Sequence, residues 1–137
     1  MGAGQEVVFV VDDEASVRKA LKRLLRAAGL CVETFASAHE FLARPRYRGA
    51  GCLVLDVQMP GMTGLDLQEE LIRTSNGLPI IFISAHDTAL QKVRATSGHA
   101  VDFFLKPFDD RQFLASVERA LTKSQSAAPS GTEGPFR

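Results

Sequence analysis

Short apolar runs alternate along the chain with longer segments in which apolar residues recur at helical spacing. The clearest run is 52–55, which leads directly into Asp56 and is bounded by glycines before it and by 59–61 after it. A continuous apolar run this short predicts a strand that is buried on both faces, as in a parallel sheet. Four more strands are expected at 7–11, 31–35, 80–83 and 103–105.

Helical periodicity fills the segments between these strands. The first helix is expected from about 14 to 28, because Val17, Leu21 and Leu24 fall on one face before Gly29 ends it. The helix at 87–98 has only Leu90 and Val93 as sizeable apolar residues, so we expect it to be short or mobile. Further helices are expected at 38–43, from Leu65 to about Asn76 and from Asp109 to about 123.

Strand and helix thus alternate five times between residues 6 and 123. Short crossovers of this kind are right-handed and require a parallel sheet with helices on both faces. The expected fold is an α/β, doubly wound three-layer sandwich in one domain. Residues 1–5 are expected to be an N-terminal tail, and 124–137, rich in Ser, Ala, Pro and Gly without periodicity, a flexible tail or linker.

Charge and hydropathy limit the partners and the cellular location that we expect for this domain. The 137 residues include 16 basic and 16 acidic side chains, so the net charge of zero does not favour nucleic acid or an acidic membrane. The amino terminus lacks a signal-peptide pattern and no apolar run could span a bilayer, which favours a cytoplasmic protein. Cys31 and Cys52 lack metal-ligand spacing and are expected to be buried, reduced thiols.

Basic residues gather in two places. The polar face of the first helix is either an ordinary solvated face or a docking surface for a partner. The arginines between the second and third strands are expected to face solvent. The helix residues are Arg18, Lys19, Lys22, Arg23 and Arg26, and the arginines are Arg44, Arg46 and Arg48.

Polar side chains follow the expected strands where each strand ends. Asp12 and Asp13 follow the first strand, Asp56 the third, Ser84 the fourth and Lys106 the fifth. Because ligands bind at the carboxyl ends of the strands in an open parallel sheet, we expect these five side chains to meet at one edge.

Three carboxylates at one edge repel one another unless a proton or a cation compensates them. Mg²⁺ prefers oxygen ligands and would, together with the ammonium of Lys106, balance the three negative charges. A balanced site of this kind can receive a phosphoryl group. Asp56 is the candidate nucleophile, because carboxylates are able to form aspartyl phosphates.

These residues, in this order, resemble the receiver domain of bacterial two-component response regulators. The resemblance rests on Asp12-Asp13, on Asp56 with the loop 59–64, on Ser84 and on the segment 106–108, and it covers roughly residues 6–123. It is greatest for receivers that precede a LuxR-type helix-turn-helix output domain. The resemblance implies the flavodoxin-like strand order 2-1-3-4-5.

The resemblance also implies roles for particular residues. Asp56 would accept a phosphoryl group from a sensor histidine kinase or a phosphotransfer protein. Ser84 and Lys106 would contact that group, and rotation of the Phe103 ring would report the modified state. The Mg²⁺ ligands would be Asp12, Asp13, Asp56 and the backbone carbonyl of Gln58, and the turn at Pro107 would contain a cis Lys106–Pro107 bond.

The implied function is a phosphorylation-dependent signalling switch. Mg²⁺-dependent phosphorylation would alter the face made by the fourth helix, the fifth strand and the fifth helix, and would promote homodimerisation or a downstream output such as transcription. The domain would catalyse only its own phosphorylation and dephosphorylation, and the basic face of its first helix would lie near the kinase. The segment after 123 has no helix-turn-helix pattern, so we expect no direct DNA binding by this chain and no membrane partner.

Two other classes of function remain open. A hydrolase or phosphotransferase with an aspartyl nucleophile would need a specificity pocket or cap, and no insertion in the sequence is long enough to supply one. A pseudo-receiver would bind a partner without phosphate. Such a module would not need the acidic pair, the acceptor, the hydroxyl and the lysine together.

Overall fold

The computed structural model describes residues 6–97 and 99–126. Its strands are β1 (Val7–Val11), β2 (Cys31–Phe35), β3 (Gly51–Asp56), β4 (Ile80–Ser84) and β5 (Asp102–Leu105). Its helices are α1 (Ala15–Ala27), α2 (Ala38–Ala43), α3 (Gly64–Arg73), α4 (Asp87–Thr96) and α5 (Asp110–Ser126). Strand and helix alternate throughout, so the expected succession of elements is confirmed.

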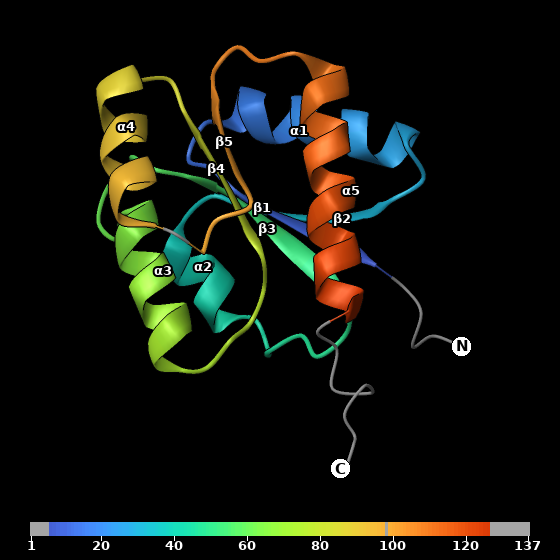
Figure 1. The fold of residues 1–137 in the computed structure, drawn as a ribbon, viewed down its shortest axis with the longest axis horizontal. Helices are drawn as coiled ribbons and strands as arrows, with labels where there is room; N and C mark the ends of the chain where they lie inside the picture. The colour runs from blue at the N-terminus through green and yellow to red at the C-terminus, as the bar shows by residue number, and fades with distance from the viewer. Residues whose placement is uncertain (1–5, 98, 127–137) are drawn as a thin grey trace.

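The strands form one parallel sheet in the order β2-β1-β3-β4-β5. Figure 1 shows α1 and α5 on one side of this sheet and α2, α3 and α4 on the other. Both the doubly wound sandwich and its strand order are therefore confirmed. No helix in the described ranges is long and apolar enough to cross a membrane.

The alternation of side chains along each strand divides the core into two layers. Val8 and Val10 of β1 pack in the cluster that includes Leu21 and Leu25 of α1 and the buried residues of α5. Phe9, between them, packs instead in the cluster on the side of α2, α3 and α4. Since β1 is buried on both faces, its almost unbroken apolar sequence follows directly from its central place in the sheet.

Burial on both faces holds for β1, β3 and β4, but the same expectation is wrong for β5. This strand lies at an edge of the sheet, its residues are half-buried and Leu105 is 41% exposed. The other edge strand, β2, is also half-buried. Cys31 lies in it and is only partly buried, which corrects the expectation for that thiol, whereas Cys52 in β3 is fully buried.

Two helices differ from what was expected. The fourth helix, α4, ends at Thr96, within the expected range 87–98, but its 10 residues make it as long as α3, so it is not short; that it is mobile stays a prediction. Its small Ala89 is buried with Leu90 and Val93 and adds to the packing surface. The last helix continues to Ser126, and the hydroxyl of Ser124 accepts a hydrogen bond from the Gly51 amide at 3.0 Å. The expected tails at 1–5 and 127–137 lie outside the described residues.

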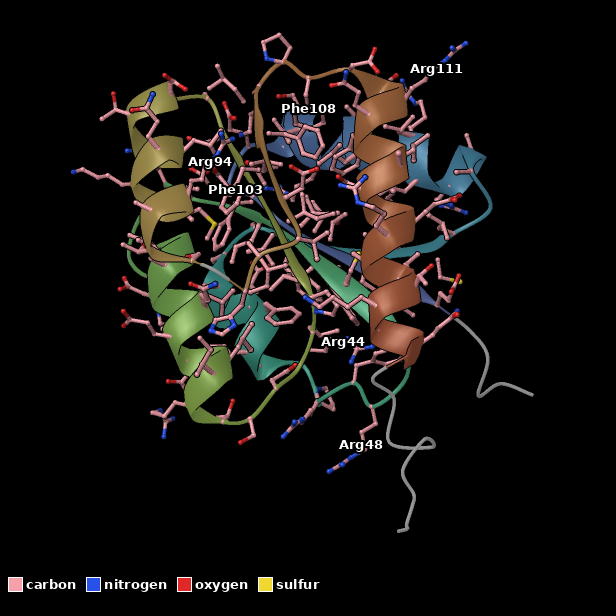
Figure 2. The ribbon with its side chains drawn as sticks, viewed as in Figure 1. Arg44, Arg48, Arg94, Phe103, Phe108 and Arg111 are labelled. Carbon is pink, nitrogen blue, oxygen red and sulfur yellow. The ribbon has the colours of Figure 1, made fainter. Side chains whose placement is uncertain are left out.

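The expectation that the three arginines between β2 and β3 face solvent is wrong for Arg44, which is half-buried; Arg46 and Arg48 are exposed, although Arg46 also has protein partners. Arg44 forms two hydrogen bonds to the Glu33 carboxylate, at 2.6 and 2.8 Å, and lies over the Phe9 ring. Arg46 donates to the carbonyls of Thr74 and Ser75. Carbonyls at the end of a helix such as α3 lack partners within the helix, which explains this contact. Arg48 is exposed and points away from the body of the molecule (Figure 2).

Truncation of Leu25 tests the packing of α1 against the sheet. Leu25 is fully buried, so Leu25→Ala should lower the free energy of unfolding by about 2–5 kcal/mol, through lost burial and a residual cavity. Ile72 on α3 is 56% exposed, so Ile72→Ala should change the free energy of unfolding by no more than about 0.5 kcal/mol. Urea denaturation measures both, and similar values for the two variants would contradict this assignment of the core.

Candidate functional site

The carboxyl ends of the strands bring the acidic side chains together, as the sequence predicted. Asp56 is the last residue of β3, while Asp12 and Asp13 follow the neighbouring strand β1. One carboxylate oxygen from each of these three residues lies within 4.8 Å of the others. Asp12 and Asp56 are buried and Asp13 is exposed, so the cluster opens to solvent on one side.

Asp12 is held firmly although its side chain is fully buried. Its Oδ1 accepts a hydrogen bond from the amide of Glu14 at 2.9 Å, and its backbone carbonyl accepts one from Arg18 at 2.8 Å. Its Oδ2 has no hydrogen bond of suitable geometry, but it forms an ion pair with Nζ of Lys106 at 2.9 Å. This buried oxygen is therefore compensated by the charge of Lys106.

Lys106 supplies the positive charge beside this cluster. Its Nζ lies 2.9 Å from Asp12 Oδ2, 3.1 Å from Glu14 Oε1 and 3.9 Å from Asp56 Oδ1. Burial alone would lower the pKa of Lys106, but the contact with Asp12 and the charge of Asp56 outweigh it and raise that pKa. The ammonium therefore stays charged at neutral pH. Sequence reasoning missed Glu14, which had no signal beyond following the acidic pair.

The carboxyl group of Asp56 lies in a place that disfavours its ionised form. Burial and, after it, the neighbouring charge of Asp12 raise its pKa from 3.8 to about 7, even though Lys106 and the hydrogen bond from the Gln58 backbone lower it. With these protein groups alone, the compensation of the carboxylate is incomplete. A cation at the cluster would favour the ionised form, which is the nucleophilic one.

The loop after Asp56 is fixed to the strand that precedes it. The amide of Gly64 donates to the carbonyl of Val57 at 2.9 Å, and Thr63 and Asp66 form a reciprocal capping box at the start of α3. A Cβ on Gly64 would lie only 2.5 Å from the backbone carbonyl oxygen of Asp56. Only glycine allows this close approach, so Gly64 helps to place the carboxyl group of Asp56.

Ser84 and Phe103 lie on the face of the sheet that α4 covers. The buried Ser84 hydroxyl donates to the carbonyl of His86 at 3.2 Å and accepts from its amide at 3.0 Å. Among the described residues its hydrogen bonds therefore go to the residue before α4 and not to Asp56. The ring of Phe103 stacks on Phe82, with 5.9 Å between the ring centroids.

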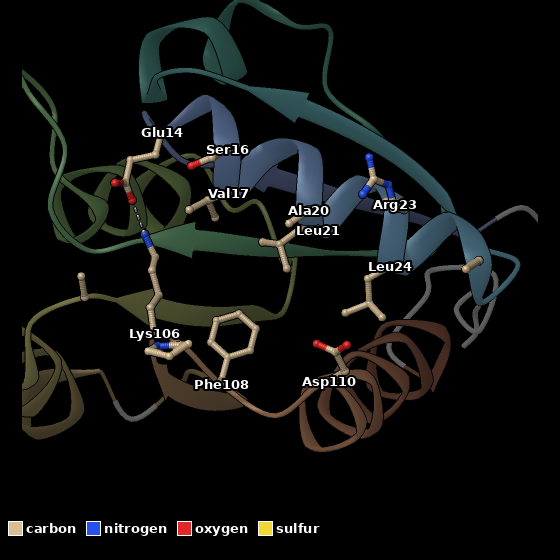
Figure 3. A pocket seen from close by; sticks show the side chains of 13 residues that line it. Glu14, Ser16, Val17, Ala20, Leu21, Arg23, Leu24, Lys106, Phe108 and Asp110 are labelled. Carbon is tan, nitrogen blue, oxygen red and sulfur yellow. Dashed lines mark hydrogen bonds and ion pairs between the residues drawn. The ribbon is translucent and has the colours of Figure 1, made fainter.

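A groove of about 800 Å³ runs alongside the site between α1 and the segment that joins β5 to α5. Figure 3 shows Glu14 and Lys106 joined by an ion pair at one end of this groove. Apolar side chains of α1 and Phe108 line much of it. The Lys106–Pro107 peptide is cis, which confirms that prediction.

The donor set suits a hard divalent cation. All three clustered groups are carboxylates, and Asp12 Oδ2 is a buried oxygen without a hydrogen bond. Mg²⁺ takes one or two carboxylates and completes its coordination with water or phosphate oxygens. The residues present therefore fit Mg²⁺.

This combination defines the class of protein: a doubly wound α/β domain whose sheet edge gathers three carboxylates and a lysine in an arrangement that suits a divalent cation. The family model of the response regulator receiver domain matches residues 8–118. The chain belongs to this family, whose members are phosphorylation-dependent switches of two-component signalling.

Individual relatives agree with this assignment. The chain is 42% identical to the response regulator protein TodT of Pseudomonas putida over 130 residues, covering 93% of this chain and 57% of TodT. It is 36% identical to the transcriptional regulatory protein FixJ of Bradyrhizobium diazoefficiens over 123 residues, covering 90% of this chain and 60% of FixJ. The solved structure of the response regulator StyR superposes with a TM-score of 0.86 at 44% identity, covering 93% of this chain and 65% of StyR. The chain thus spans less than two thirds of each of these proteins.

Substitution of Gly64 tests the close packing behind Asp56. Gly64→Ala should lower the free energy of unfolding by about 1–3 kcal/mol, because the new Cβ must displace the backbone of β3. The same displacement should weaken Mg²⁺ binding, measured by titration calorimetry. Gly77→Ala is the matched control, since a Cβ there meets nothing within 4 Å. Equal melting temperatures for the two variants would contradict the proposed role of Gly64.

Proposed function

We propose that the chain is a phosphoryl-accepting switch in which Asp56 is the acceptor and Mg²⁺ is required. The observation that carries this proposal is the position of the buried Asp56 carboxylate, which lies within the acidic cluster and 3.9 Å from the ammonium of Lys106. The donor would be a sensor histidine kinase or a phosphotransfer protein, as for other members of the family. Mg²⁺ would be held by Asp12, Asp13, Asp56 and the backbone carbonyl of Gln58.

The chemical step needs little from the protein beyond position and charge. A carboxylate oxygen of Asp56 attacks the phosphorus of a phosphohistidine, and the O–P bond forms as the P–N bond breaks. The electron pair of the broken bond stays on the imidazole nitrogen. Lys106 and the hydroxyl of Ser84 would stabilise the oxygens of the transferred group, and Mg²⁺, if held by the carboxylates, would supply further positive charge there.

The response is proposed to begin at Ser84. If the Ser84 hydroxyl turns toward a phosphoryl group on Asp56, it gives up its two hydrogen bonds to His86. His86 is the residue immediately before the first turn of α4. The space that the hydroxyl leaves lies on the same face of the sheet as Phe103, whose ring can then rotate inward. The face made by α4, β5 and α5 changes shape, and homodimerisation or a transcriptional output follows. FixJ, named as a transcriptional regulatory protein, supports such an output.

The kinase or phosphotransfer protein is proposed to dock at the groove beside α1. This groove combines an apolar lining with Lys106 at one end, so a partner seated in it would lie next to the acceptor. Basic residues on the exposed face of α1 would add long-range attraction for an acidic partner. Direct DNA binding by this chain is not part of the proposal.

The remaining alternative is a pseudo-receiver that binds a partner without phosphate. Such a module would not need a buried carboxyl group, Asp56, with the ammonium of Lys106 at 3.9 Å. It would also not need the raised pKa of Asp56. The intact set of groups therefore favours the phosphoryl acceptor.

Replacement of the acceptor tests the chemistry. Incubation with acetyl phosphate and Mg²⁺ should add one phosphoryl group to the wild-type chain, measured by intact mass, and Asp56→Asn should abolish the addition because the nucleophilic oxygen is lost. Asp110→Asn, the same change at an exposed position on α5, should leave it intact. Addition of a phosphoryl group to Asp56→Asn, or an addition that a chelator does not reduce, would exclude the proposed mechanism.

Amide hydrogen exchange tests which part of the chain changes when the acceptor site is occupied. Beryllofluoride, which imitates a phosphoryl group, should change amide exchange first between residues 84 and 104, because Ser84 holds the start of α4. Sedimentation velocity on the same samples should show a shift toward dimer. Unchanged exchange in this range, together with a response elsewhere, would rule out the route from Asp56 through Ser84 to Phe103.

A further inference from the structure

We infer that Arg94 is a positioning residue that holds the Phe103 ring in its resting arrangement and so sets how readily the switch responds. The inference rests on the proposed function, since it concerns the regulation of that same site. The guanidinium carbon of Arg94 lies 5.2 Å from the centroid of the Phe103 ring, within the range of a cation–π interaction. Figure 2 shows the two residues next to one another between α4 and β5.

The position of Phe103 makes this contact relevant to the site. Phe103 pairs with Phe82 across β4 and β5, and side chains alternate along a strand, so Phe103 shares a sheet face with Ser84. Helix α4 covers that face and packs Leu90 and Val93 into the same core layer. Any rearrangement of the Phe103 ring must therefore occur underneath or beside α4, where Arg94 is placed.

The two ends of α4 are attached differently. At its start, His86 makes no side-chain cap, and the backbone there is tied to Ser84. At its end, the buried hydroxyl of Ser97 donates to Oε1 of the buried Gln68 on α3 at 2.8 Å. The end of the helix is thus fixed to α3, while its start depends on Ser84, the residue that the phosphoryl group would draw away.

Arg94 lies between these two ends, one turn before the fixed end. It is exposed, and across the described residues the Phe103 ring is the one partner that the structure gives it. The neighbouring Lys92 is equally exposed on α4 but has no such ring contact. The cation–π interaction is formed while Ser84 is bonded to His86, so it favours the resting arrangement and opposes rotation of the ring.

Removal of Arg94 should therefore favour the responsive state. Arg94→Met keeps the length of the side chain and its helix propensity but loses the charge. The initial rate of Asp56 phosphorylation by acetyl phosphate should rise about two- to fivefold, the population change expected from losing one exposed cation–π contact. Lys92→Met removes the same charge from the same helix and should not raise the rate. Arg94→Lys, which can still place an ammonium over the ring, should fall between Arg94→Met and the wild type.

A double-mutant cycle with Phe103→Leu separates this role from a general effect on α4. In the Phe103→Leu background the Arg94→Met change should have no effect on the rate, because the contact is already lost. An unchanged rate for Arg94→Met, or the same increase with and without the Phe103 ring, would overturn the inference while leaving Asp56 as the acceptor.

If the wild-type chain took up no phosphoryl group, the proposed function would fail, and amide exchange in the unmodified protein would still decide the role of Arg94. Exchange in β5 should then be faster in Arg94→Met than in Lys92→Met. Equal exchange in the two variants would exclude a positioning role for Arg94.

Discussion

The structure depends on one electrostatic constraint: two carboxylates, Asp12 and Asp56, are buried beside each other at the edge of the sheet. Burial and mutual repulsion both oppose their charges, and the ion pairs of Lys106 only partly compensate them. A bound cation would resolve this conflict, because it is attracted by the negative charges already present. The imbalance that is costly for the isolated domain would therefore favour Mg²⁺ binding, and Mg²⁺ together with Lys106 would in turn offset the charge of the phosphoryl group proposed for Asp56.

The fold holds this imbalance in place by surrounding it with rigid elements. The central strands β1 and β3 are buried on both faces, so the carboxyl groups at their ends have little freedom to move apart. The loop that leaves Asp56 is tied back to β3 through Gly64, and the backbone of Asp12 is held by Arg18. The closely packed core thus keeps the two carboxyl groups near each other despite their repulsion.

The proposed response, by contrast, involves the side of the sheet on which β5 and α4 lie. Strand β5 is a half-buried edge, and the hydrogen bonds between Ser84 and His86 join the start of α4 to the site. The far end of α4 is fixed by the buried pair of Ser97 and Gln68. A helix fixed at one end and conditionally held at the other can change a surface without disturbing the core, which is what a switch requires.

The sequence by itself determined the order of elements, the parallel sheet and the residues at the strand ends, because these depend on local periodicity and on the rule that parallel strands end at one edge. The strand order implied by the family resemblance already placed the second and fifth strands at the edges, but only the tertiary structure showed that β5 and Cys31 are half-buried there. It alone paired Arg44 with Glu33, placed Glu14 beside Lys106 and brought Arg94 over Phe103. Each of these contacts joins residues on different elements, so its formation depends on how those elements pack against one another and leaves no periodic signal in the chain.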